Sequence, residues 1–250
     1  MSLSDVCPSS FDPELWKGII AALEGDEEPI ALFDADGTLW ADDLGEAHLH
    51  VLADHALVSA GDAYEGLLDE YASRCAIDVD DGYAWGARIC AELDEETLLW
   101  SAKEAWNRHR PKLLKPMADL VRALLEAGVD VAIVSASNRW IIEAAVSELG
   151  VGPEGVIAVD LERRDGKLTS EVVQPMPNGA GKVGAVKARF KGRPALAFGN
   201  SVHDVPMLTY ARQGALVLAT HAAQSRLSEE LEAARGAHGW LYIPLVHPGG

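Results

Sequence analysis

The chain has 250 residues, of which 48% are hydrophobic and 24% charged, and this ordinary globular composition excludes a disordered, collagen-like or coiled-coil protein. Its formal net charge of −18 repels nucleic acid and anionic lipid, so we expect no nucleic-acid partner. No apolar run approaches the roughly 18 residues that a membrane span needs, so we expect no membrane partner. The three cysteines cannot all pair within one chain and lack CxxC spacing, which favours reduced thiols in a cytoplasmic protein.

Short apolar runs alternate with segments of helical periodicity along most of the chain. Helices are predicted at 13–24, 117–127, 140–149, 183–190 and 224–234. Strands are predicted at 30–33, 129–134, 156–159, 195–198 and 215–218. Strands that alternate with helices are typical of βαβ units, so we predict an α/β fold whose mainly parallel sheet carries helices on both faces.

Two stretches depart from this alternation. Residues 41–112 contain several helical segments, no convincing strand and a large excess of Asp and Glu over Lys and Arg. We predict that they form an inserted helical subdomain, and that 1–40 and 113–250 together form the core domain. Farther along, Asp165-Gly166 lies between alternating residues of 158–173, which predicts a β-hairpin.

Polar residues of several kinds lie where strands end or the next helix begins. Because the carboxyl ends of parallel strands meet at one edge of a sheet, we expect these residues to lie close together. The set comprises Asp34, Asp36, Ser135, Lys182, Asn200 and Asp204. It suits phosphoryl transfer, a reaction that depends on positioning and on neutralising charge around phosphorus. Carboxylate and carboxamide oxygens are ligands that Mg²⁺ prefers, and an acidic chain would otherwise repel a phosphate, so we expect Mg²⁺ as the cofactor.

The sequence DADGTL at 34–39, Ser135, Lys182 and GNSVHD at 199–204 resemble, in order and spacing, the four motifs of the haloacid dehalogenase superfamily. The insertion resembles the C1 cap of the phosphoserine-phosphatase-like branch of that superfamily. The resemblance implies a Rossmann-like core. It also implies a phosphatase or phosphomutase that works through an aspartyl-phosphate.

The resemblance assigns roles to individual residues. Asp34 would be the nucleophile, and Asp36 would act as general acid and then as general base. Ser135 and Lys182 would complete the catalytic set by contacting the phosphoryl group. Mg²⁺ would be held by Asp34, Asp36, Asn200 and Asp204, and Gly37 and Ala136 would help to bind the substrate.

One position departs from the family pattern, because Asn200 lies where members usually carry aspartate. An amide oxygen can still ligate a cation, but the site has one fewer negative charge, for which Asp204 could compensate. This departure leaves a second class of function open, a binding protein of the same fold whose catalysis is weakened. Within enzymes, a phosphoserine or polyol-phosphate phosphatase and a phosphomutase are the alternatives.

The acidic insertion bears on the substrate. It should disfavour nucleotides and phosphoproteins, so the predicted partner is a small phosphorylated metabolite with a neutral or cationic leaving group. The stretches 34–46 and 177–187 are similar to phosphorylcholine phosphatases, and on that resemblance Trp40, Asp43 and Glu46 would face a choline group. Aromatic residues at helical spacing are, however, more often part of a helical core.

Overall fold

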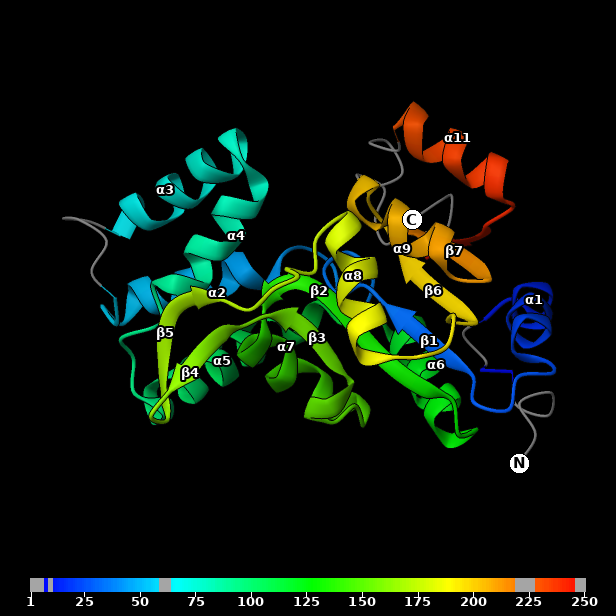
Figure 1. Ribbon diagram of the computed structural model, residues 1–250, viewed down its shortest axis with the longest axis horizontal. Helices are drawn as coiled ribbons and strands as arrows, with labels where there is room; N and C mark the ends of the chain where they lie inside the picture. Colours follow the sequence, from blue (N-terminus) through cyan, green and yellow to red (C-terminus); the bar gives the residue numbers. More distant parts are fainter. Residues whose placement is uncertain (1–6, 9–10, 59–63, 219–227, 246–250) are drawn as a thin grey trace.

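The computed structural model describes residues 7–8, 11–58, 64–218 and 228–245. An α/β part built on a parallel sheet lies beside a helical part formed between the first two strands (Figure 1). The predicted α/β fold with a helical insertion is therefore confirmed.

Six parallel strands form the central sheet. In chain order they are β1 (Ile30–Phe33), β2 (Asp130–Asn138), β3 (Val156–Val159), β6 (Leu196–Gly199), β7 (Gln213–Leu218) and β8 (Leu241–Pro244), and their order in space is β3-β2-β1-β6-β7-β8. Leu32 in β1 lies opposite Ala132 in β2 and Ala197 in β6. The three strands that precede the predicted motifs are therefore neighbours at the centre of the sheet.

Two strands differ from the prediction. β2 continues through Ser135–Asn138, which the sequence predicts as a loop, and its pairing with β3 shifts register between Val134 and Asn138. β8 has no counterpart among the predicted strands, because a four-residue strand that ends in proline carries little periodicity. It forms an edge of the sheet, where a proline does not interrupt hydrogen bonding on both sides.

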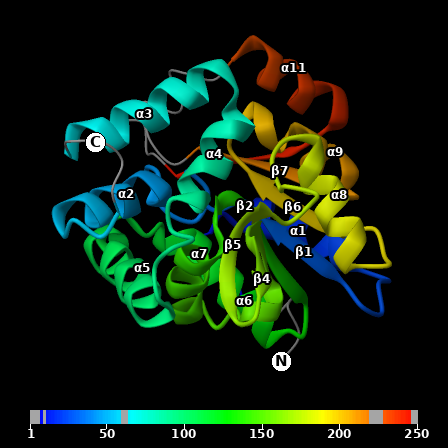
Figure 2. The ribbon, with the colours of Figure 1, turned by 60° about the vertical axis from the view of Figure 1, so that its left-hand side comes forward.

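Helices cover both faces of the sheet (Figure 2). One face packs against α1 (Pro13–Leu23), α6 (Lys115–Glu126) and α7 (Arg139–Val146), and the other against α8 (Ala180–Arg189), α9 (Val205–Tyr210) and α11 (Glu229–His238). Side chains alternate along β1, since Ala31 and Phe33 face the first group while Ile30 and Leu32 face the second. Short 3-10 helices lie at Arg110–Lys112, Ser147–Leu149, Pro153–Gly155 and Val202–Asp204.

The ends of several helices differ from the prediction by a few residues. α6 begins at Lys115, because a proline such as Pro116 is tolerated in the first turn. α8 begins at Ala180, which puts Lys182 in its first turn. The predicted helix at 224–234 lies partly outside the described residues, and the described part belongs to α11.

The insertion consists of α2 (Leu44–Asp54), α3 (Tyr64–Ile77), α4 (Val79–Arg88) and α5 (Glu95–His109). Aspartates start three of these helices, since the side chains of Asp43, Asp78 and Asp94 accept hydrogen bonds from backbone N–H groups of the first turn. Between 41 and 112, the residues that the structure describes contain no strand. The exact boundaries of the insertion, 40/41 and 112/113, stay predictions.

A β-hairpin from the α/β part reaches the insertion. It consists of β4 (Leu161–Arg164) and β5 (Lys167–Val172), joined at Asp165 and Gly166, whose φ angles of +52° and +79° suit a tight hairpin turn. The predicted hairpin is thus confirmed. Arg88 Nε in α4 donates to the Ser170 carbonyl oxygen at 3.2 Å, so the hairpin also supports the inserted helices.

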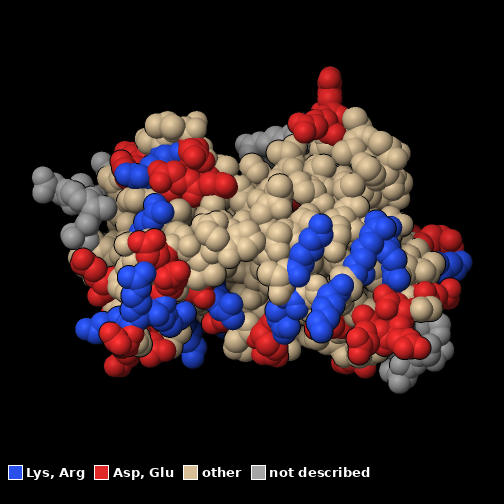
Figure 3. Space-filling view, viewed as in Figure 1, with Lys and Arg blue, Asp and Glu red and all other residues tan. Residues whose placement is uncertain are grey.

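Charge is distributed unevenly over the face drawn in Figure 3. Lys and Arg gather over α8 and the loop after it, whereas the insertion carries Asp and Glu interspersed with Lys and Arg. Several of these acidic groups form ion pairs, for example Glu70 and Asp81 with Arg74. Within the described ranges, no helix is long and apolar enough to cross a membrane. The cytoplasmic location stays a prediction.

Candidate active site

Asp34 directly follows β1, and its carboxyl group is almost buried. Oδ1 accepts a hydrogen bond from Lys182 Nζ at 2.6 Å, and Oδ2 accepts one from Thr38 Oγ1 at 3.0 Å. Burial and the nearby Asp204 raise the pKa of Asp34 to about 7, although Lys182 acts in the opposite direction. Near neutral pH, additional positive charge beside this carboxyl group would therefore increase the fraction that is ionised.

Lys182 lies in the first turn of α8 and is 2% exposed. Its ammonium group donates to Asp34 Oδ1 and Asp204 Oδ1, both at 2.6 Å, and to the Val134 carbonyl oxygen at 2.9 Å. Burial alone would lower the pKa of Lys182, but the two carboxylates outweigh it and hold this pKa above its usual range. Lys182 is thus a fixed cation between the residue after β1 and the middle of β2, with all three N–H groups engaged.

Asp204 holds Lys182 and the loop after β6 in place. Besides the ion pair at Oδ1, its Oδ2 accepts hydrogen bonds from the backbone N–H groups of Asn200 and Ser201 and from Ser201 Oγ, at 2.9–3.0 Å. Burial works against ionisation, yet Lys182 and these N–H groups hold the pKa of Asp204 below its usual range. Because both oxygens already accept hydrogen bonds from protein groups, this environment differs from that of the direct Mg²⁺ ligand predicted from sequence.

Oxygen atoms from three residues converge next to Asp34. One end of the Asn200 carboxamide lies 3.2 Å from both the Asp36 carbonyl oxygen and Asp34 Oδ2. With its nitrogen at that end, the amide donates to both oxygens. With its oxygen there, three hard oxygen atoms face one another, as around a divalent cation. The donor set of Asp34, Asn200 and the Asp36 main chain therefore fits Mg²⁺.

Gly37 makes the approach of Asn200 possible. Its φ angle is +77°, and a Cβ atom here would lie 1.9 Å from Asn200 Nδ2, so only glycine fits without displacing that amide. The Gly37 N–H donates to the Trp40 carbonyl oxygen at 2.8 Å. Its main-chain donor is thus used within the loop, and the contact of Gly37 with the substrate stays a prediction.

Asp36 lies where the α/β part meets the insertion. Its Oδ1 accepts hydrogen bonds from Trp40 Nε1 and from the backbone N–H of Leu44, the first residue of α2, both at 2.7 Å. Its Oδ2 accepts one from Ser137 Oγ, also at 2.7 Å. Three donors from different segments therefore fix the orientation of this carboxylate.

These side chains line one cavity of about 80 Å³. Most of the residues predicted from sequence contribute to its wall: Asp34, Asp36, Asp43, Ser135, Ala136, Lys182, Asn200 and Asp204. Five further lining residues have no role assigned from the sequence: Tyr83, Ser137, Asn178, Ser201 and His203. The strand ends therefore bring together the four motif segments, as expected, and the insertion adds Asp43 and Tyr83.

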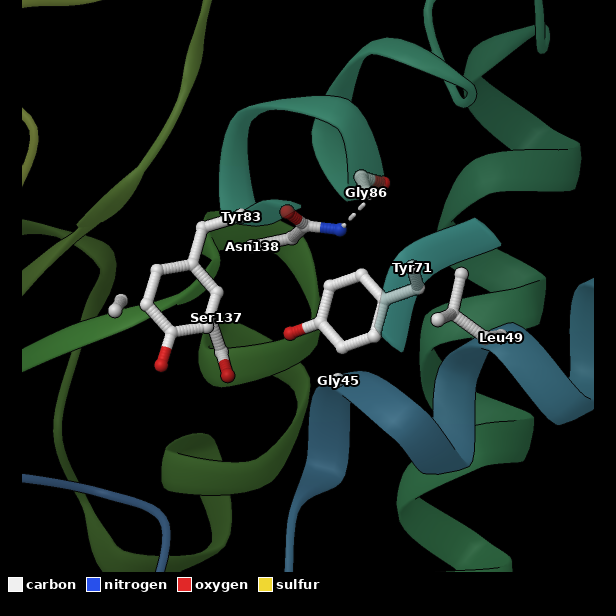
Figure 4. Close-up of a pocket in the computed structure, with 8 residues that line it drawn as sticks. Gly45, Leu49, Tyr71, Tyr83, Gly86, Ser137 and Asn138 are labelled. Carbon is white, nitrogen blue, oxygen red and sulfur yellow. Dashed lines mark hydrogen bonds between the residues drawn. The ribbon is translucent and has the colours of Figure 1, made fainter. Parts of the chain in front are cut away.

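A narrower pocket of about 10 Å³ adjoins the cavity and shares Tyr83, Ala136 and Ser137 with it (Figure 4). In Figure 4 the hydroxyl groups of Tyr71, Tyr83 and Ser137 gather on one side of this pocket. Asn138 Nδ2 donates to the Gly86 carbonyl oxygen at 3.1 Å, which ties the end of β2 to α4. The insertion thus supplies the wall opposite the motif residues.

The three residues predicted to face a choline group lie in different environments. Asp43 lines the cavity, and burial together with Asp36 raises the pKa of Asp43 to about 8. Trp40 is fully buried against Trp106, with ring centroids 5.4 Å apart, and is not among the described residues that line the cavity. Glu46 is exposed and also lies outside the described lining. Trp40 Nε1 contacts Asp36, and the contact of Trp40 with a choline group stays a prediction.

Some of the missed residues carry a signal in the sequence. Ser137 lies two residues after Ser135, and Asn178 lies four residues before Lys182, so both belong to segments already expected at the site. Tyr83 has no such signal, because it lies in the middle of α4 and reaches the cavity only through the packing of the insertion.

Comparison with known proteins identifies a family and a relative that resemble this chain. The sequence profile of the haloacid dehalogenase-like hydrolases matches residues 31–209. A phosphoserine phosphatase from Halobacterium salinarum is 29% identical over 188 residues, which cover 73% of this chain and 82% of that protein.

Solved structures show the same fold. A protein of unknown function from Bordetella pertussis Tohama I, 26% identical, superposes with a TM-score of 0.74 over 88% of this chain and all of that chain. A phosphoserine phosphohydrolase-like protein from Francisella tularensis subsp. tularensis SCHU S4, 20% identical, gives a TM-score of 0.54 over 86% of this chain and 94% of that chain.

Proposed function

The chain belongs to the haloacid dehalogenase-like hydrolase family, and on that premise we propose that it is a Mg²⁺-dependent phosphatase that hydrolyses a small phosphomonoester through an aspartyl-phosphate on Asp34. The observation that carries the proposal is the buried contact between Asp34 and Lys182 beside the oxygen atoms of Asn200 and the Asp36 main chain. One cavity thus contains the proposed nucleophile, a fixed cation and the proposed donor set for a divalent ion.

Attack on phosphorus requires the ionised form of Asp34. Lys182, 2.6 Å from Oδ1, favours that form, while burial and Asp204 disfavour it. When bound, Mg²⁺ would supply positive charge that offsets both the substrate phosphate and the surrounding carboxylates. Asp34, Asn200 and the carbonyl oxygen of Asp36 would hold it.

Asp36 would act as general acid in the first step and as general base in the second. As Asp34 forms its bond to phosphorus, the bond from phosphorus to the leaving oxygen breaks, and Asp36 gives that oxygen a proton. Asp36 then takes a proton from the water that attacks phosphorus, the bond to Asp34 breaks, and inorganic phosphate leaves. Ser135 and Ala136 line the wall that would hold the remaining phosphate oxygens.

The wall around the leaving group favours an alcohol without a negative charge. Among the described residues that line the cavity, Lys182 is the only Lys or Arg, and its three N–H groups are engaged. A carboxylate on the leaving group would therefore lie near Asp43, with no lysine or arginine of the described lining free to form an ion pair with it. This supports polyol phosphates or cationic esters such as phosphocholine.

Phosphoserine is the second candidate, because a phosphoserine phosphatase is among the relatives. A comparison of kcat/KM for phosphoserine, phosphocholine, phosphoethanolamine and glycerol phosphate separates the two. Highest kcat/KM for phosphoserine would support the second candidate. Because the pKa of Asp43 is raised to about 8, its carboxyl group is mostly ionised only above that pH, where a preference for cationic esters should be lost in Asp43→Asn. The preference should be kept in the matched control Glu46→Gln, which removes an exposed charge outside the cavity.

Hydrolysis of p-nitrophenyl phosphate tests the proposed activity. We expect turnover with Mg²⁺, none with EDTA, and none in Asp34→Asn, whereas Asp130→Asn at the exposed opposite end of β2 should behave as wild type. Equal inertness of wild type and Asp34→Asn with Mg²⁺ would favour the binding-protein alternative. Isomerisation of a sugar phosphate without release of inorganic phosphate would identify a phosphomutase instead.

A further inference from the structure

The three hydrogen bonds to Asp36 are not equivalent. Oδ1 accepts from two nitrogen donors, Trp40 Nε1 and the backbone N–H of Leu44. Neither group can accept a hydrogen bond, so both keep Oδ1 an acceptor in every protonation state. Oδ2 accepts from Ser137 Oγ, and a hydroxyl group can rotate to donate or to accept.

We propose that Asp36 carries its transferable proton on Oδ2 and that Ser137 is the residue that positions this oxygen. A proton on Oδ1 would face two N–H groups that point at it and cannot turn away. A proton on Oδ2 meets only a hydroxyl group that can adapt. The inference rests on the proposed function, since it concerns the step in which Asp36 protonates the leaving oxygen.

The surroundings of Ser137 fit such a role. Its backbone N–H donates to Ser135 Oγ at 3.0 Å, and it lies on β2 rather than in a free loop, so its side chain starts from a fixed point. Ser137 lines both the cavity and the adjoining pocket. Tyr83 also lines both cavities, and in the view of Figure 4 the hydroxyl groups of Ser137 and Tyr83 lie on the same side of the pocket. Trp40, by contrast, donates to the other oxygen, Oδ1, and is fully buried.

The proposed proton step conserves atoms and charge. With Asp36 protonated at Oδ2, Ser137 accepts from it or donates to another acceptor until the substrate binds. As the phosphorus–oxygen bond breaks, the proton moves from Oδ2 to the leaving oxygen and yields the free alcohol. The newly ionised Oδ2 again accepts the Ser137 hydroxyl, which stabilises the carboxylate as it forms.

The test uses two esters whose leaving groups have similar shape but different need for a proton. Phenolate is a poorer leaving group than p-nitrophenolate, so a defect in leaving-group protonation should affect phenyl phosphate more strongly. For Ser137→Ala we expect kcat/KM to fall at least about tenfold on phenyl phosphate, within the range that general acid catalysis contributes, and less than about threefold on p-nitrophenyl phosphate. Ser137→Thr, which keeps the hydroxyl, should restore most of the loss.

Ser147→Ala removes an exposed hydroxyl that donates only to Ala144 within its own helix end, and it should leave both esters unchanged. If Ser137→Ala does not fold by circular dichroism, Ser137→Cys replaces it, with the same difference between esters expected from a weaker donor. An equal loss on both esters, or no loss on either, overturns the role of Ser137 while an active wild type preserves the proposed function. A wild type inert on both esters overturns the proposed function and this role with it.

Discussion

Because Gly37 and Asn200 are in close contact, a substitution at Gly37 should displace the Asn200 side chain, a proposed metal ligand, while residue 200 itself stays asparagine. In Gly37→Ala, the new methyl group would start 1.9 Å from Asn200 Nδ2 and 2.8 Å from its Cγ. The amide must therefore shift by more than 1 Å to reach ordinary contact, which changes its position relative to Asp34 Oδ2 and the Asp36 carbonyl oxygen. Asn200 itself, its charge and its capacity to bind remain.

Two costs have to be separated. Any residue other than glycine at a φ of +77° costs about 1–2 kcal/mol of folding free energy, or a few degrees of Tm in a chain of this size. Gly25 has the same φ of +77° and nothing within 4 Å of its would-be Cβ, so Gly25→Ala incurs the backbone cost alone. The displaced amide is the free end of a side chain, so its movement should add little to the loss of stability. It should cost about tenfold in Mg²⁺ affinity, at the lower end of what disturbed ligand positions typically cost.

The assay is the dependence of p-nitrophenyl phosphate hydrolysis on Mg²⁺ concentration, with the Mg²⁺-induced rise in Tm as a readout that needs no turnover. We expect both variants to lose similar stability without Mg²⁺, and only Gly37→Ala to need about ten times more Mg²⁺ for half-maximal activity. A Gly37→Ala protein that keeps the Mg²⁺ dependence of wild type would refute the placement of Asn200 among the ligands.

Three further predictions concern side chains that are charged, become charged or are prevented from ionising inside the protein. Lys182→Met leaves Asp34 and Asp204 without their shared cation. The free energy of unfolding measured by urea denaturation should therefore fall by about 3–5 kcal/mol, and hydrolysis should vanish. Unchanged stability would contradict the burial of this ion pair. Asn200→Asp adds a carboxylate beside Asp34 Oδ2 and the Asp36 carbonyl oxygen. We expect this variant to have a lower Tm than wild type in EDTA and a larger rise in Tm when Mg²⁺ is added. An equal rise in Tm would count against ligation by residue 200. Burial lowers the pKa of His48 to about 3, so the unfolded chain binds the proton below its ordinary pKa of 6.5 while the folded chain does not. Between pH 7 and pH 5, the free energy of unfolding should therefore fall by about 2 kcal/mol more in wild type than in His48→Gln. An equal fall in both proteins, measured by urea denaturation at the two pH values, would disprove this prediction.

The meeting of the motif residues could be predicted from the sequence for a simple physical reason. Buried parallel strands are short, continuous apolar runs, and the residues after them share one edge of the sheet. Asp34 and Ser135 follow such runs, and Lys182 enters with the next helix. The structure brings all three to one cavity.

The wall contributed by the insertion could not be predicted in the same way. The sequence pattern around an aromatic residue such as Trp40 is the same whether its ring faces a cavity or a neighbouring helix. The orientation of the Trp40 ring depends on where α5 places Trp106. Tyr83 reaches the cavity only because α4 packs against the end of β2. These positions follow from angles between helices, which a single sequence does not encode as a local pattern.

The proposed need for a metal ion is supported by how Lys182 is held. Asp34, Asp36, Asp43 and Asp204 all line the cavity, and the one lysine among the described lining residues already shares its charge between two of them. A phosphate that brings about two negative charges therefore enters without a free lysine or arginine to meet it. A divalent ion among the oxygens of Asp34 and Asn200 changes that balance, so phosphate and metal should each increase the affinity of the site for the other by the same factor. On the proposed function, the cation would therefore take part in substrate recognition as well as in the chemical step.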